Sequence, residues 1–153
     1  MIEPWQNPTI IAHSQLLLNS FQHWTGQELF KVTGTPTEQA HQLFYAPFVL
    51  VSHNTEDDPI FNYGNQQALA LWELNWSEFT QMPSRKTAEH TLREDRQRLL
   101  QDTAAKGFGE FAGVRISSTG KRFKIKRGLL WNVVDKESRY CGQAATYNDY
   151  EFI

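Results

Sequence analysis

Residues 111–147, FAGVRISSTGKRFKIKRGLLWNVVDKESRYCGQAATY, contain three strand-like segments joined by two turns. In the middle segment, Phe123 and Ile125 alternate with Arg122, Lys124 and Lys126. Because successive side chains on a strand face opposite sides of a sheet, this spacing predicts one apolar face and one cationic face. An antiparallel meander of this kind needs other elements to cover its apolar face. The three strands are expected near residues 113–117, 121–135 and 140–147.

The segments before this stretch can supply that cover. Residues 1–8 form an irregular lead-in, and residues 9–31 are expected to form a helix that Thr9 caps. Its apolar stripe either packs across the sheet of its own domain or pairs with a second copy of the chain. The stripe contains Ile10, Leu17, Phe21 and Trp24.

Residues 32–153 are expected to form the main domain. Residues 45–53 are apolar and β-branched, which predicts a buried strand, and residues 60–63 form a second short strand. Asn65 can cap the helix that follows, and a longer helix is expected over residues 91–106. The predicted fold class is α+β: a five-stranded antiparallel sheet with helices on one face and an added N-terminal helix.

Composition narrows the possible classes of function. The chain has 153 residues, enough for one domain with a hydrophobic core, and its net charge of −2 provides no overall field toward nucleic acid or membrane. The single cysteine, Cys141, excludes an internal disulfide and a four-cysteine zinc site. No apolar run reaches the ~20 residues of a membrane helix, and no signal peptide is recognisable. A cytoplasmic protein is therefore expected.

The sequence contains no motif for enzymatic chemistry. Neither a G-x-S-x-G motif, a Gly-rich phosphate loop nor an H-E-x-x-H motif occurs. We therefore expect no catalytic site and no metal site, although a small cone-shaped α+β enzyme of the ketosteroid-isomerase type stays an alternative. Such an enzyme would need an Asp or Glu base in an apolar pocket.

A small-molecule pocket is expected where polar side chains lie beside aromatic walls between sheet and helices. Arg85 either binds a carboxylate ligand or forms an internal ion pair that fixes its loop. Asn132 and Gln143 belong to the pocket if they face the helices, and are surface amides if they face outward. The candidate ligand-binding residues are Trp72, Ser84, Arg85, Trp131, Asn132 and Gln143.

Basic residues are concentrated in the meander. Six of the 15 Lys and Arg residues lie within residues 115–127. They form a solvated strand face, bind an acidic protein partner or a second copy of the chain, or contact phosphates as a nucleic-acid-associated regulator would. The candidate partner-binding residues are Arg115, Arg122, Lys124 and Lys126.

The order of elements resembles the PAS fold. More narrowly, FNYGNQQALALWE (61–73), WSEFTQMPSRKTAE (76–89), GVRISSTGKRFKIKRGLLWNVVD (113–135) and GQAATY (142–147) resemble the MEKHLA domain family. This PAS-related domain occurs as a free-standing protein in bacteria and algae, and at the C-terminal end of homeodomain–leucine zipper transcription factors in plants. The resemblance implies a sensory or protein-interaction module that binds a small ligand between sheet and helices and signals through protein contacts, including a homodimer through the N-terminal helix or the outer sheet face.

The resemblance does not identify a cofactor. Light-sensing flavin PAS domains carry a reactive cysteine in the region that reads MPSRKT at residues 82–87 here, although Gly142-Gln143 resembles their last-strand glutamine. A haem protein needs an axial ligand, and His90 is the histidine in the central helical region. Neither flavin nor haem is expected, and the ligand stays unknown.

Overall fold

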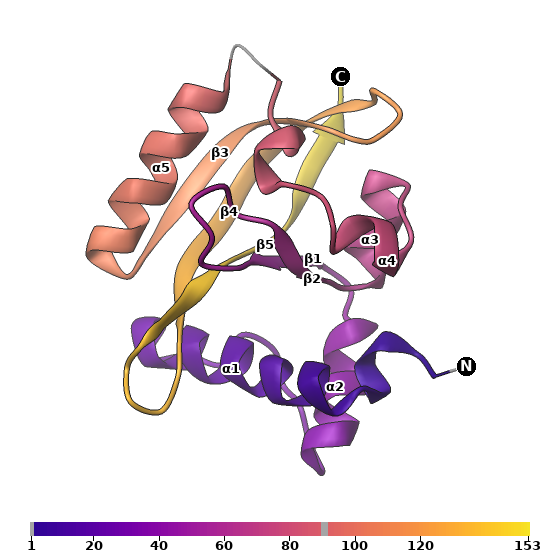
Figure 1. Ribbon diagram of the computed structural model, residues 1–153, viewed down its shortest axis with the longest axis vertical. Coiled ribbons are helices and arrows are strands. Elements are labelled where there is room, and N and C mark those ends of the chain that lie inside the picture. The colour runs from indigo at the N-terminus through magenta and orange to yellow at the C-terminus, as the bar shows by residue number, and fades with distance from the viewer. Residues whose placement is uncertain (1, 90–91) are drawn as a thin grey trace.

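A single five-stranded antiparallel sheet, with helices on both faces, organises the molecule (Figure 1). The computed structural model describes residues 2–89 and 92–153. The strands lie side by side in the order β2-β1-β5-β4-β3, which confirms the predicted α+β sheet. They are β1 (Val49–His53), β2 (Phe61–Gly64), β3 (Phe108–Ile116), β4 (Arg122–Val134) and β5 (Tyr140–Phe152).

Two groups of helical elements enclose the sheet. The group between β2 and β3 covers one face, which we call the cavity face, and the N-terminal group covers the other, which we call the α1 face (Figure 1). The first group is α3 (Gln66–Trp72), α4 (Trp76–Phe79), the 3-10 helix η2 (Ser84–Thr87) and α5 (Arg93–Lys106). The second is the 3-10 helix η1 (Pro4–Gln6), α1 (Pro8–Thr25) and α2 (Pro36–Phe44).

The predicted alternation at the start of β4 is confirmed. Phe123 and Ile125 are 0% and 1% exposed and join the core of the cavity face. The ring of Phe123 lies 5.4 Å from that of Trp72 on α3, measured between centroids. Lys124 and Lys126 face solvent. The apolar face of the meander is therefore covered by the helices that lie between β2 and β3 in the sequence.

The alternation of β4 shifts by one residue beyond Ile125. The pairing of β4 with β5 is irregular between Ile125 and Leu129, and an extra residue in one strand moves all later side chains to the other face. Leu130 consequently lines the cavity face, whereas Trp131 packs against Phe21 of α1, with ring centroids 5.0 Å apart. The prediction that Trp131 shares a pocket with Trp72 is wrong for this reason.

Helix α1 packs across its own sheet. Leu17 and Phe21 of the predicted stripe are buried, which decides between the two uses of the stripe considered above. The boundaries differ from the prediction. Asn7, not Thr9, caps the helix by accepting a hydrogen bond from the Thr9 N–H, and the helix ends at Gly26, whose φ of 73° suits glycine.

Helix α5 was expected to begin at Thr91, which lies outside the described residues. The described helix starts at Arg93 and ends at Gly107, as predicted for its C-terminus. None of the helices in residues 2–89 and 92–153 combines the length and the apolar character needed to cross a membrane.

Truncation of Leu17 tests whether α1 is part of the core. Because the side chain is fully buried, we expect Leu17→Ala to lower the free energy of unfolding by about 2–5 kcal/mol. The exposed neighbour Asn19 provides the control, since Asn19→Ala should change it by less than about 0.5 kcal/mol. Urea unfolding followed by circular dichroism measures both. Equal effects of the two substitutions would contradict the packing of α1 on the sheet.

Candidate functional site

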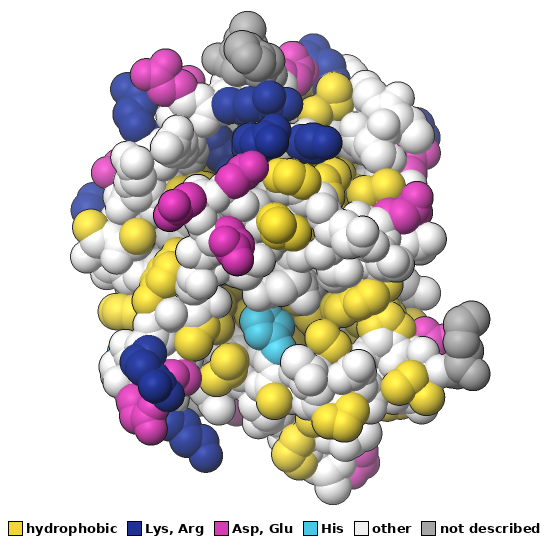
Figure 2. Space-filling model, in the orientation of Figure 1, with side chains coloured by type: hydrophobic (Ala, Val, Ile, Leu, Met, Phe, Trp, Pro, Cys, Tyr) yellow, Lys and Arg dark blue, Asp and Glu magenta, His cyan; other side chains and the backbone are white. Residues whose placement is uncertain are grey.

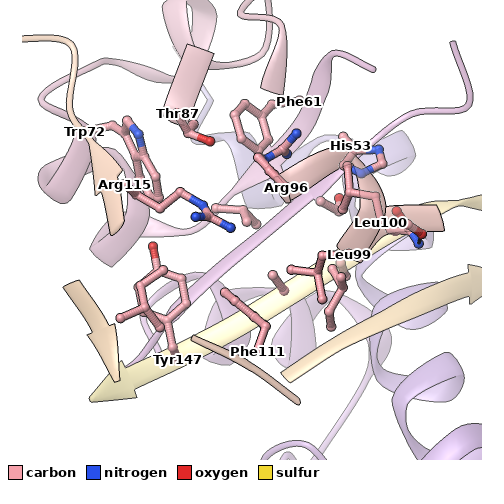
Figure 3. Close-up of a pocket in the computed structure, with 17 residues that line it drawn as sticks. His53, Phe61, Trp72, Thr87, Arg96, Leu99, Leu100, Phe111, Arg115 and Tyr147 are labelled. Carbon is pink, nitrogen blue, oxygen red and sulfur yellow. Dashed lines mark hydrogen bonds between the residues drawn. The ribbon is translucent and has the colours of Figure 1, made fainter. Parts of the chain in front are cut away.

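A cavity of about 50 Å³ lies between the cavity face of the sheet and the helices that cover it (Figure 3). Strands β1, β2, β3, β4 and β5 all contribute to its wall, and α5, α3 and η2 close it. Its apolar lining includes Val51, Phe61, Leu99, Phe111, Ile125 and Ala145. This volume accommodates a few water-sized groups and is well below the about 300–1,000 Å³ of a site for a drug-sized ligand.

Two arginines contribute to this mostly apolar lining. Arg96 comes from α5 and Arg115 from β3, and both side chains are partly buried. Figure 3 shows both guanidinium groups directed toward the space between helices and sheet. Burial, together with the positive charge of Arg115, lowers the pKa of Arg96 to about 9, and burial also lowers the pKa of Arg115. Both groups remain charged at neutral pH.

Arg115 lies on the opposite face from the one predicted. It pairs directly with Phe123 across β3 and β4, and residues opposite each other in adjacent strands point to the same face of a sheet. Since Phe123 faces the cavity side, so does Arg115. The prediction that Arg115 belongs to the exposed basic face is therefore wrong.

Trp72 lines the cavity as predicted, and its indole Nε1–H has no hydrogen-bond partner among the described residues. Tyr147 on β5 has the same property, since its hydroxyl is buried without a partner. Figure 3 shows this hydroxyl directed toward Arg115. Burial raises the pKa of Tyr147, which keeps the phenol protonated and able to donate.

Gln143 and Asn132 face the helices and connect α5 to the sheet. Gln143, which also lines the cavity, donates from Nε2 to the carbonyl of Leu100 (2.9 Å) and to Oδ1 of Asn132 (3.2 Å). Asn132 donates from Nδ2 to the carbonyl of Ala104 at 3.1 Å. The two amides are therefore not surface groups, and they fix the C-terminal half of α5.

Ser84 and Arg85 lie apart from the cavity lining. Arg85 donates from Nε to both carboxylate oxygens of Asp58, at 3.1 and 3.2 Å, so the structure contains the internal ion pair that was one of its two predicted roles. Exposed pairs of this type contribute at most about 1 kcal/mol to stability. Ser84 is fully buried, and its hydroxyl has no partner among the described residues.

Arg96, His53 and Tyr147 line the cavity, although they were not among the predicted site residues. A signal for Arg96 was present, because it lies four residues after Leu92 and three before Leu99, and residues at this spacing share one face of a helix. A signal for Arg115 was also present, since it lies four residues after Phe111 on the same strand and must share its face.

Most of the predicted basic face is neutralised within the chain. Arg122 pairs with Glu89, and Lys126 pairs with Glu151 at 3.3 Å. Lys121 and Arg127 also have carboxylate partners, at 3.3 and 2.9 Å. On the side of the molecule in Figure 2, Lys and Arg side chains likewise lie next to Asp and Glu side chains rather than forming one uninterrupted basic surface.

The cavity does not suit a flavin. Its volume of about 50 Å³ is too small for a fused ring system, and the Gln143 amide is already bonded to Leu100 and Asn132. The haem candidate His90 lies outside the described residues.

Several solved structures have a fold similar to that of this chain. The PAS domain of a Colwellia psychrerythraea protein matches with a TM-score of 0.62 and 10% identity, over 72% of this chain and 92% of that one. The PAS domain of a LuxR-family transcriptional regulator from Burkholderia thailandensis, solved in complex with ethanol, gives 0.55 and 14%, over 74% and 95%. An RNA-binding light-oxygen-voltage receptor gives 0.66 and 14%, over 80% of this chain and 35% of that one.

The chain thus has the PAS fold. The MEKHLA domain matches residues 11–152, so the chain belongs to the MEKHLA domain family, as the sequence resemblance indicated. No curated protein matches this chain. Fold and family together suggest a sensory module.

Two histidines, the buried His53 and the partly buried His13, make the stability of the fold sensitive to acid. Burial lowers the pKa of His53, which lines the cavity, and of His13, which bonds the Ser52 hydroxyl, from 6.5 to about 4 in each case. Between these values the unfolded chain binds more protons than the folded one, so the free energy of unfolding falls as pH drops from 6.5 toward 4. From pH 7 to pH 5 we expect a loss of about 2 kcal/mol for each histidine.

Urea unfolding at the two pH values measures this loss. The double variant His13→Gln, His53→Gln should lose less stability over the same interval, by about 4 kcal/mol. His23→Gln serves as the control, because His23 is exposed. A pH dependence that is the same in all three proteins would show that these two histidines do not cause it.

Proposed function

We propose that this protein is a PAS-like sensory module that binds a small ligand between α5 and the sheet. A change in the position of α5 alters α1, and another protein that contacts this chain responds to that change. The observation that carries this proposal is the junction of α5 and α1 at one point of β4. The small cavity beside α5 supports the proposal because it offers a place for the ligand to bind. The Burkholderia PAS domain, which has a similar fold, was solved in complex with a small molecule, ethanol.

Helix α5 is suited to respond to a ligand because few of its contacts are apolar. Of its described side chains only Thr103 is buried, and two side-chain amides, those of Gln143 and Asn132, bond its backbone carbonyls. Elements with few buried apolar contacts are the ones that open at low free-energy cost. A ligand that adds contacts under α5 therefore changes its stability and position more than those of the strands.

The C-terminal end of α5 contacts α1 directly. The Asn132 N–H donates to the carbonyl of Gly107, and the Trp24 indole N–H donates to the carbonyl of Asn132, both at 2.8 Å. A Cβ atom on Gly107 would lie 2.3 Å from the Trp24 ring, so helix end and indole are in close contact. Residue Asn132 thus joins α5 on the cavity face to α1 on the other face of the sheet.

The surface that we propose for contact with a partner consists of side chains that remain exposed on α1 and β4. The outer side of α1 and the exposed side chains of Arg122, Lys124 and Lys126 remain our proposed contacts for a protein partner or a second copy of the chain. Lys124 has no ion-pair partner among the described residues, and it lies opposite Glu151 in the register of β4 and β5.

Neither alternative function gains an observation in its favour. The described residues that line the cavity include no Asp or Glu, which an isomerase of the ketosteroid type would need as its base. The ion pairs of the basic face reduce the charge available to nucleic-acid phosphates.

Hydrogen exchange measures the proposed coupling. Gln143→Leu leaves the carbonyl of Leu100 without its partner, which costs about 1–3 kcal/mol, so the amides of α5 should exchange roughly tenfold to a hundredfold faster. The proposal requires that amides at the C-terminal end of α1, near Trp24, also exchange faster, while those of α3 do not.

Gln97→Leu is the matched control, because Gln97 lies on the exposed side of the same helix. It should leave exchange in α1 unchanged. If exchange in the Gln143 variant is faster only in α5, the proposed coupling of α5 to α1 is contradicted.

A further inference from the structure

We infer that the ligand of the cavity is a small organic anion, a short-chain carboxylate, held by Arg96 and Arg115. This inference rests on the proposed function, because it names the ligand class of the same cavity. It begins from the two guanidinium groups that reach this space from different elements, α5 and β3.

Neither arginine has an acidic partner in the described part of the chain. Arg115 donates to the carbonyl of Val114 at 2.9 Å and lies 5.8 Å from the centroid of the Phe111 ring. Arg96 forms no ion pair with a described residue, in contrast to Arg98 on the exposed side of α5, which pairs with Asp95. The cavity lining described above is likewise without a carboxylate.

Two like charges in a partly buried site without a counterion are unfavourable to the fold. The mutual repulsion of Arg96 and Arg115 contributes to the lowered pKa of Arg96, after burial itself. An anion between them would relieve this repulsion and gain charge-assisted hydrogen bonds, and guanidinium groups match the planar geometry of a carboxylate.

Two of the three other cavity groups without a partner among the described residues are donors. The third, Nε2 of His53, is an acceptor, because the lowered pKa of His53 keeps the ring neutral and its Nδ1–H donates to the carbonyl of Asn54. The indole N–H of Trp72 can only donate, and the Tyr147 hydroxyl, kept protonated by burial, can donate as well. Trp72 and Tyr147 are 3% and 5% exposed, so water in bulk does not satisfy these atoms. Two cations and two donors outnumber this single acceptor, so the set suits the oxygens of an anion better than a ligand that is mainly a donor.

The rest of the lining limits the ligand to a small molecule with an apolar part. Phe61, Leu99 and Ile125 surround the cavity, and its volume of about 50 Å³ excludes large acids. A carboxylate with a short alkyl chain satisfies the two guanidinium groups at one end and the apolar wall at the other. Since Arg96 belongs to α5, such a ligand would also connect α5 to β3.

Amide NMR spectra of the ¹⁵N-labelled protein, titrated with sodium propionate at constant ionic strength, test this inference. Propionamide and 1-propanol are the neutral probes of similar size. We expect propionate to shift resonances of cavity residues, and Arg96→Gln and Arg115→Gln each to weaken its binding at least tenfold. Arg98→Gln, on the exposed side of α5, is the matched control and should leave the affinity unchanged.

The stability of these variants separates a ligand-binding role from a structural one. Because neither guanidinium has an acidic partner within residues 2–89 and 92–153, Arg96→Gln and Arg115→Gln should keep or raise the melting temperature of the protein without propionate. A fall in melting temperature with unchanged propionate affinity would overturn the inference in favour of a structural role.

The remaining outcomes distinguish the two proposals. If propionamide or 1-propanol shifts the cavity resonances as strongly as propionate, and the arginine variants bind them equally, the anion inference is overturned while the ligand-binding module of the proposed function stands. If none of the three probes shifts cavity resonances, the inference fails, and the ligand input of the proposed function loses its support as well.

Discussion

The structure depends on one constraint: β4 must bury side chains on both faces of the sheet. At its start, Phe123 and Ile125 pack under the middle helices, and near its end Trp131 and Val133 pack under α1. The irregular pairing between Ile125 and Leu129 reconciles these two demands, because it moves the buried positions from one face to the other within a single strand. Both hydrophobic clusters, and thus both groups of helices, are positioned by this shift.

The same shift places polar side chains where the two faces can communicate. Asn132 and Gln143 face α5, yet the backbone of Asn132 also accepts the Trp24 indole N–H from the opposite side. A single residue, Asn132, thus has hydrogen bonds to groups on both sides of the sheet, so under our proposal a change in the hydrogen bonds of α5 reaches α1 through one residue. Allosteric coupling through the sheet therefore needs no long chain of intermediates, although it requires that α5 have two distinguishable positions.

Much of the fold was predictable because local patterns and long-range packing agree. The alternation around Phe123 and the caps at Asn65 and Gly107 are local signals that the structure retains. The faces of Trp131 and Arg115 were not predicted. For Trp131 the cause is an irregularity in pairing around Gly128, a glycine inside a strand pattern that signals a bulge but was not used as one. For Arg115 the signal from Phe111 existed but was outweighed by the neighbouring run of lysines and arginines.

The candidate site was harder to predict than the fold because it draws on β-strands and helices that are distant in sequence. Trp72 could be placed in the pocket from the sequence, whereas for Gln143 the sequence left open whether it faces the helices or solvent. Arg96 carries a charge on an apolar helical face. A charged side chain is normally predicted to be exposed, and its burial becomes clear only when the position of the sheet is known. The sequence also does not show that Arg96 lacks an acidic partner among the described residues, because this depends on its neighbours in three dimensions.

The close approach of Gly107 to Trp24 has a mechanical consequence. With no room for even one carbon atom between them, the C-terminal end of α5 cannot move closer to the Trp24 ring, and a displacement of α5 that keeps this contact point fixed is a rotation about it. A helix of 14 residues is about 21 Å long, so the contact acts as a fulcrum. The first turns of α5, which carry Arg96, then travel much farther than the end that touches α1, and a small twist at the indole corresponds to a wide swing over the cavity.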